Sequence, residues 1–213
     1  MRRRLTRTRR EQGWTLIEIM VVLAIIATLT AGVSVAIPAA TAKMHRTTCA
    51  QHLNELGAVY QMATMEHPGR PAHDGAALFL SWRKSRQHIE AGSEETLLCA
   101  GDPDMRFPRT PEDQARWDDV DLMAAPSDLC SFAVRDFTQH PVRRDKGERR
   151  ILACDRQGND GRTAHHKGGL NVLFDNGSVK FLGHEQLGLT ADLPIVVGPD
   201  SDHPLLSQVR TGQ

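Results

Sequence analysis

One carboxylate lies alone in a long apolar stretch near the amino terminus. Between Trp14 and Ile37, Glu18 is the only ionisable side chain. A charge at the centre of a membrane helix costs about 2.5–3.5 kcal/mol, so such a group usually has a partner and a function. A plain membrane anchor gains nothing from a carboxylate, and we therefore expect Glu18 to pair with another group.

The apolar stretch itself is long enough to cross a bilayer. Its 24 residues would extend roughly 36 Å as a helix, against a hydrocarbon core of about 30 Å. Six arginines precede it, which predicts a cytoplasmic amino terminus and an exported remainder. A secretory signal is the alternative, but its apolar core has only about 7–15 residues.

The residues Gly-Trp-Thr-Leu-Ile-Glu at positions 13–18 resemble the processing site of type IV pilins and type II secretion pseudopilins. This resemblance implies that prepilin peptidase cuts after Gly13 and methylates the new amino terminus at Trp14. It also implies that Glu18 is the assembly glutamate, which contacts the terminal amine of a neighbouring subunit. Trp14 departs from the family, in which phenylalanine is usual at this position.

Elementary electrostatics agrees with the roles that this resemblance implies. Cleavage would expose an ammonium group at Trp14, and Glu18 follows one helical turn later. A paired carboxylate in an apolar bundle costs far less than an unpaired one. Pairing between subunits would fix their axial register, as a buried polar residue does in a coiled coil.

The helix is expected to continue beyond the membrane, from about Thr15 to about Met65, with Pro38 as the place of a kink. Apolar residues recur at helical spacing in its second half: Cys49, Leu53, Leu56, Tyr60 and Ala63. Residues 76–89 favour a second helix, and Leu97–Cys99 a short strand. The chain from there to Leu129 is rich in Pro and Asp, which is typical of a long surface loop with at most one turn of helix.

Four further strands are expected, at residues 131–137, 150–154, 170–174 and 179–182. The last two flank Asn176-Gly177, the dipeptide that most strongly favours a tight hairpin. A long helix followed by strands predicts an α+β fold, with an antiparallel sheet packed on the helix. The expected organisation has five parts: leader 1–13, membrane helix 14–38, amphipathic helix 39–66, head 67–198 and polar tail 199–213.

Three segments of the amphipathic helix and the head resemble elements of a large bacterial pseudopilin-like family. Residues 49–57 are similar to its C-x-x-N-L-x-x-L-G stretch, and residues 98–103 to its L-C-P-S-D-P element. Residues 166–177 match its carboxy-terminal H-x9-D-G signature, with Asn176 in place of the aspartate. The turn geometry survives this change, whereas a charge-dependent role of the turn would not.

The chain has four cysteines, all after the apolar stretch: Cys49, Cys99, Cys130 and Cys154. An even number in an oxidising compartment suggests disulfides, with three connectivities open. If the first two strands pair, Cys130 and Cys154 could approach within the about 4.4–6.8 Å that a bridge requires. The resemblance implies the same arrangement, because Cys49 and Cys99 fall in its elements and Cys130 and Cys154 do not. The preferred hypothesis is therefore the pair of bridges Cys49–Cys99 and Cys130–Cys154. The alternative is that Cys49 is simply a small apolar residue of the buried helix face.

A polar group in the head could hold a metal ion: Asp155, Asn159, Asp160 and His166. The resemblance to major pseudopilins implies calcium, although the spacing does not fit an EF-hand loop. Zinc needs three or four converging ligands, and the chain has no H-E-x-x-H motif. We expect His166 to hydrogen-bond across its loop and His165 to be solvated.

Two functions follow for this chain. The first is a structural, non-enzymatic subunit of a pilus or pseudopilus, with prepilin peptidase, other subunits and the inner-membrane assembly platform as partners. It would be a single-pass inner-membrane protein with a periplasmic head, able to enter a filament. The alternative is a membrane-tethered metal-dependent enzyme or binding module built on His166, Asp155 and Asp160. Without the leader, 20 basic residues face 25 acidic ones, which argues against nucleic acid as a partner.

Overall fold

The computed structural model describes residues 14–102, 110–124, 127–142, 150–157, 165–190 and 193–211. The chain divides into two compact units, Met1–Thr41 and Ala42–Gln213. One helix, α1 (Leu16–Glu66), begins in the first unit and ends in the second. Among the described helices, α1 alone is long and apolar enough to be a candidate membrane span. The predicted long helix is therefore confirmed, and Pro38 lies inside it.

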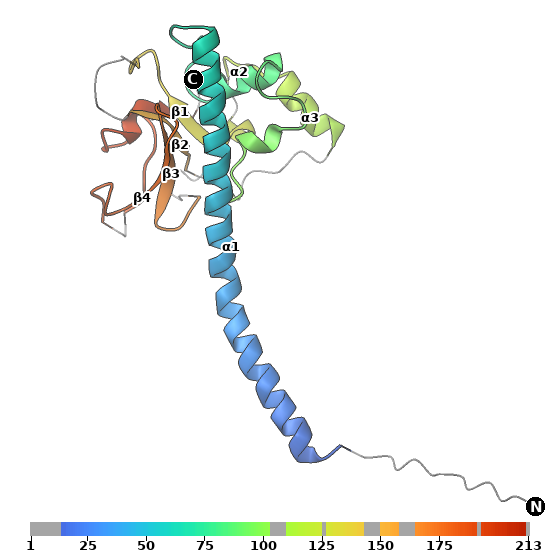
Figure 1. Cartoon of the computed structure of the whole chain (residues 1–213). Helices are drawn as coiled ribbons and strands as arrows, with labels where there is room; N and C mark the ends of the chain where they lie inside the picture. Colours follow the sequence, from blue (N-terminus) through green and yellow to red (C-terminus); the bar gives the residue numbers. More distant parts are fainter. Residues whose placement is uncertain are drawn as a thin grey trace, which may run out of the picture. The chain divides into compact units, whose positions relative to one another are not determined.

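The second unit is an α+β head built on the carboxy-terminal part of α1 (Figure 1). Its sheet has five antiparallel strands in the order β4-β3-β2-β1-β5. The strands are β1 (Phe132–Arg135), β2 (Ile151–Asp155), β3 (Gly169–Phe174), β4 (Val179–Gly183) and β5 (Val209–Arg210). The predicted fold class is confirmed, and so are the four predicted strands.

Two apolar layers cover the two faces of the sheet. Between the sheet and α1 lies the larger cluster, to which the helix contributes Cys49, Leu53 and Leu56, all fully buried. These residues follow the spacing predicted for the buried face of the helix. The other face packs against the carboxy-terminal segment, in which Leu206 and Val209 are fully buried.

The β3–β4 hairpin forms at the predicted dipeptide and packs on α1. Gly177 has a φ of +80°, and a Cβ at this position would lie 2.6 Å from Nε2 of Gln61. On the helix, a Cβ at Gly57 would lie 2.8 Å from Cδ1 of Leu173. The family-like element at residues 166–177 thus packs on the one at residues 49–57, at glycines that allow close approach.

Two expectations for the middle of the chain are wrong. Leu97–Cys99 is not a strand: the 3₁₀ turn η1 (Glu94–Leu97) precedes an extended Leu98. The segment expected as a loop contains α3 (Pro111–Asp118), and Trp117 is buried with its Nε1 donating to the Leu129 carbonyl at 3.2 Å. Proline at the first helical position, after Thr110, is the local signal for this helix.

The predicted second helix is confirmed as α2 (Ala77–Ser85). A buried arginine of α2 connects it to two neighbouring short helices. Arg83 is fully buried. Its Nε donates to Glu94 Oε1 at 2.6 Å, and its Nη1 donates to Asp118 Oδ1 at 2.8 Å. One guanidinium therefore links α2, η1 and α3.

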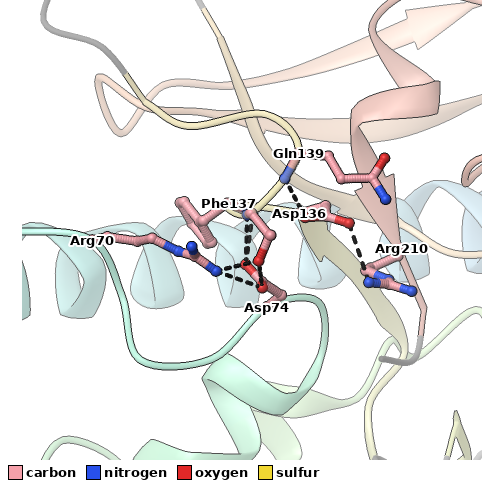
Figure 2. Close-up of polar contacts among 7 residues, drawn as sticks. Arg70, Asp74, Asp136, Phe137, Gln139 and Arg210 are labelled. Carbon is pink, nitrogen blue, oxygen red and sulfur yellow. Dashed lines mark hydrogen bonds and ion pairs between the residues drawn. The ribbon is translucent and has the colours of Figure 1, made fainter.

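Polar contacts also tie the segment after α1 and the carboxy-terminal strand β5 to the residues that follow β1 (Figure 2). Asp74 accepts hydrogen bonds from the backbone N–H of Phe137 at 2.7 Å and from Arg70 at 3.0 Å. Asp136 accepts from Arg210 of β5 at 3.1 Å. Residues 199–213, expected as a polar tail, thus contribute the 3₁₀ turn η3 (Leu206–Gln208) and an edge strand.

Candidate functional site

The first candidate site is the amino-terminal turn of α1. Glu18 Oε2 accepts hydrogen bonds from the Thr15 backbone N–H at 2.8 Å and from the Thr15 hydroxyl at 2.9 Å. The Thr15 hydroxyl lies 3.3 Å from the Glu18 backbone N–H, which donates to it. This reciprocal arrangement is a capping box, which begins a helix by satisfying its free N–H groups. Glu18 is therefore held in the first turn of the helix, four residues after Trp14 in the sequence.

The surroundings of this turn are apolar and uncovered. Trp14 is 73% exposed, and the large apolar side chains that follow along α1 are exposed as well. Gly13, the predicted cleavage residue, lies outside the described residues. The roles of Gly13, Trp14 and Glu18 in cleavage, methylation and assembly therefore remain predictions.

The second candidate site lies where α1 meets β2 and β3. The predicted disulfide between Cys49 and Cys99 is present, with a Cα–Cα distance of 4.9 Å. His166 Nε2 lies 3.4 Å from Cys99 Sγ and 3.5 Å from Asp155 Oδ2. Asp155 Oδ2 accepts a hydrogen bond from the Asn171 backbone N–H at 2.6 Å. The cysteine, L-C and histidine elements of the second resemblance thus converge at one place.

Burial dominates the electrostatics of this pair. It raises the pKa of the Asp155 carboxyl to about 7, although the hydrogen bonds from Asn171 oppose the shift. It lowers the pKa of His166 to about 4, with the nearby His165 and Arg46 acting in the same direction. Both groups are therefore neutral at pH 5–6, so their 3.5 Å contact joins two uncharged groups and is not an ion pair.

The expectation that His165 is solvated is wrong. Its side chain is 1% exposed, and its Nε2 lies 3.3 Å from Asp102 Oδ2. Arg156 Nη2 lies 3.3 Å from the same oxygen. The loop that carries Asp102 covers both histidines, because a Cβ at Gly101 would lie 2.7 Å from Cε1 of His166. The contact with Asp102, which is distant in sequence, thus accounts for the burial of His165.

The other predicted bridge, Cys130–Cys154, is wrong. Both cysteines are unbridged and buried. In the β1–β2 register Cys154 lies opposite Ala133, so it belongs to the apolar layer away from α1, whereas Cys130 packs in the layer facing α1. Alternation of side chains across the sheet therefore separates the two sulfurs. Burial raises the pKa of the Cys130 thiol to about 11, which leaves it a poor nucleophile.

The predicted metal ligands are only partly brought together. Asp155 and His166 lie side by side, while Asn159 and Asp160 fall outside the described residues. The donor atoms of Cys49, Cys99, Asp155 and His166 lie within 4.8 Å of one another. Calcium prefers six to eight oxygen ligands, so this cluster of sulfur, imidazole and one carboxylate does not fit calcium. A calcium site that uses Asn159 and Asp160 stays a prediction.

Among the described residues, the side chains around His165 and His166 are buried. Asp155 and His166 are 1% and 4% exposed, and they lie against the disulfide, the sheet and the loop with Gly101. A catalytic pair normally faces a cleft that a substrate can enter. This geometry gives no support to the alternative of an exported enzyme.

Comparison with known proteins gives one match. Residues 8–34 match the model of the prokaryotic N-terminal methylation motif. No curated protein matches the chain, and no solved structure matches it. The matched residues include the predicted cleavage residue, the capping box and the beginning of the apolar helix. The chain thus carries a prepilin-type N-terminal methylation motif, followed by a long helix and an antiparallel sheet in a pilin-like architecture.

Proposed function

We propose that this protein is a structural subunit of a pilus or pseudopilus, of the kind assembled by type IV pilus or type II secretion machines. Prepilin peptidase removes residues 1–13 and methylates Trp14, and the mature chain assembles through α1. The observation that carries the proposal is the methylation motif at residues 8–34, with Glu18 in the first turn of an apolar helix.

The exposed apolar surface of α1 supports this assignment. Large side chains from Leu16 to Leu29 are 42–78% exposed in the isolated chain. So much apolar surface is stable only in lipid or against other apolar helices. Before assembly the inner membrane covers it, with the amino terminus in the cytoplasm and the head in the periplasm. In a filament the helices of neighbouring subunits replace the lipid.

The capping box gives Glu18 a defined position for subunit contact. Cleavage after Gly13 would create an ammonium group at Trp14, one residue before the Thr15 that holds the carboxylate. A neighbour's ammonium that reaches Glu18 adds a charge-assisted hydrogen bond in an apolar environment, where such bonds are strong. This contact would select one axial register between subunits.

The head suits a structural role. Its disulfide fastens α1 to the loop after η1, so force along the helix reaches the folded head through a covalent bond. The buried His166 and Asp155 lie behind this bond. We infer that they support the junction, and that the head has no enzymatic activity.

Processing is tested by mass spectrometry of the membrane-bound protein in cells with and without prepilin peptidase. We expect a methylated Trp14 terminus with the peptidase and the intact leader without it. Gly13→Leu should keep the leader in both strains, because only a small residue fits the extended peptide at the cut. A chain that still begins at Met1 in peptidase-positive cells would overturn the proposal.

A further inference from the structure

The disulfide junction brings together four side chains of the types that bind zinc. They are Cys49 of α1, Cys99 after η1, Asp155 at the end of β2 and His166 before β3, and all four are buried. Sulfur, imidazole and carboxylate donors in a set of four are the usual ligands of tetrahedral zinc. The segments that carry them are distant in sequence, so the fold itself assembles the set.

We propose that the reduced protein binds one Zn²⁺ here, through the two cysteine thiolates, His166 Nε2 and the Asp155 carboxylate. Zinc and the disulfide would then be alternative ways of closing the same junction. The proposal does not depend on whether the protein assembles into a filament.

The distances already resemble those around a zinc ion. Zinc bond lengths of about 2.0–2.3 Å in tetrahedral geometry place neighbouring ligand atoms about 3.3–3.8 Å apart. His166 Nε2 lies 3.4 Å from Cys99 Sγ and 3.5 Å from Asp155 Oδ2. The Cα atoms of Cys49 and Cys99 are 4.9 Å apart, close enough for two thiolates to share an ion after side-chain rotation.

One oxygen of the Asp155 carboxylate lacks a hydrogen-bond partner among the described residues, and a cation could bind to it. Asp155 is 1% exposed, and its Oδ1 has no hydrogen-bond partner among the described residues. Its Oδ2 is held by the Asn171 backbone N–H at 2.6 Å, which fixes the orientation of the group. Neighbours that orient ligands in this way are typical of protein metal sites.

Close packing orients the imidazole as well. The His166 ring lies against the backbone of Gly101, where a Cβ would approach it to 2.7 Å. This contact directs Nε2 toward the sulfur and the carboxylate. The donor set favours zinc over calcium, because thiolate and imidazole are soft or intermediate ligands.

The Cys49–Cys99 disulfide must be reduced before zinc can bind. A phosphine and one water molecule supply what this reduction needs. The phosphine attacks one sulfur, breaks the S–S bond and takes oxygen from water to become the phosphine oxide. The two hydrogens of that water end on the sulfurs, giving two thiols. Each thiol releases its proton to solvent when it binds the ion.

The experiment uses full-length protein in detergent, purified oxidised and stripped of metal with EDTA. One sample is reduced with a phosphine, which competes for zinc less than a dithiol would. Bound zinc is counted by elemental analysis after gel filtration. Cobalt substitution then reports thiolate ligation through charge-transfer bands in the near ultraviolet. We expect one ion per reduced chain and none per oxidised chain.

Variants identify the ligands. His166→Gln and Asp155→Asn should each weaken zinc binding at least about tenfold. They are purified with the disulfide intact, so circular dichroism verifies their fold before reduction. The double variant Cys130→Ala/Cys154→Ala, which removes the two unbridged cysteines, should bind zinc as the unmodified protein does.

Three results would overturn the proposal. The first is a reduced protein that binds no more zinc than the oxidised one, or that unfolds in the presence of zinc. The second is unchanged zinc affinity in His166→Gln. The third is loss of the cobalt bands in the Cys130→Ala/Cys154→Ala variant.

Discussion

At the scale of single residues, Glu18 combines two requirements in one side chain. Its carboxylate accepts two hydrogen bonds from Thr15, which stabilises the start of α1. The same carboxylate is the one negative side chain in the apolar half of the helix. A contact with a neighbouring subunit must therefore share the carboxylate with the capping box or replace it. Two oxygens with several lone pairs allow sharing.

Glu18→Ala and Glu18→Gln separate these requirements. Both should leave cleavage after Gly13 largely intact, because the peptidase acts on the preceding bond. Filament yield should fall strongly in both, since neither keeps the charge that pairs with an ammonium group. Glutamine can still accept the hydrogen bonds of Thr15, so helix capping, worth about 1 kcal/mol, is lost only with alanine.

Filaments sheared from cells and measured against total mature protein give the result. Glu55→Ala provides the control, because it removes another exposed carboxylate of α1, within the head. Normal filament yield from Glu18→Ala would contradict the assembly role.

At the scale of elements, the joint of α2, η1 and α3 depends on charge. Arg83 is fully buried and Glu94 is 1% exposed. Burial alone would raise the pKa of Glu94, but the hydrogen bonds from the Gly92 backbone and Arg83 outweigh it and hold the pKa below its ordinary value. The ionised form is therefore the one that the folded protein favours.

Glu94→Gln should accordingly destabilise the head in a pH-dependent way. We expect a loss of about 2 kcal/mol at pH 7, the scale of a hydrogen bond to a charged group. A carboxyl with a lowered folded pKa stabilises fully above its unfolded pKa, near 4.3, and this stabilisation disappears as pH falls through the folded pKa. The difference between the two proteins should thus shrink below about pH 4.

Urea unfolding at several pH values measures this difference. Glu95→Gln, which changes an exposed neighbour, serves as the control. A difference that stays constant from pH 7 to pH 3 would show that the charge of Glu94 does not stabilise the joint.

The elements that local patterns could predict are those with strong periodic or turn signals. The spacing of Cys49, Leu53 and Leu56 predicted the buried face of α1, and Asn176-Gly177 predicted the β3–β4 hairpin. Strand β5 has two residues and exists only because β1 offers an edge. No local sequence pattern predicts so short a strand, because its hydrogen-bond partner, β1, lies about 75 residues away in the sequence.

The candidate sites also differ in how far sequence could predict them. The amino-terminal motif is contiguous, so sequence alone located it. The cysteine pairing could be predicted only with knowledge of which face of the sheet each side chain occupies. Cys154 lies opposite Ala133, so its side chain is on the other face of the sheet from Cys130. The burial of His165 depends on Asp102, a contact between distant loops. Sequence spacing contains no information on either arrangement.

At the scale of the whole molecule, α1 is fastened to the head at successive points. The disulfide holds it at Cys49, and Gly57 allows Leu173 of β3 to approach closely. Near its end, Tyr60 stacks with Phe137, with ring centroids 6.1 Å apart. Of these contacts only the disulfide is covalent, and along the sequence it lies nearest to the apolar half of the helix.

The variant Cys49→Ala/Cys99→Ala tests how far this covalent link stabilises the head. The cross-link closes a loop with a sequence separation of 50 residues, and chain entropy predicts a loss of about 4 kcal/mol. Cys130→Ala/Cys154→Ala should instead show the smaller cost of two trimmed core side chains. Thermal unfolding in EDTA, with and without a phosphine, separates the two effects. The phosphine should lower the Tm of the unmodified protein and of the Cys130→Ala/Cys154→Ala variant, and leave that of Cys49→Ala/Cys99→Ala unchanged.

Hydrogen exchange should show faster opening of α1 around Leu53 in the Cys49→Ala/Cys99→Ala variant, because local opening there is no longer restrained by a covalent link to the head. Equal exchange at Leu53 in both double variants would mean that packing alone, through Gly57 and Tyr60, keeps the helix on the head.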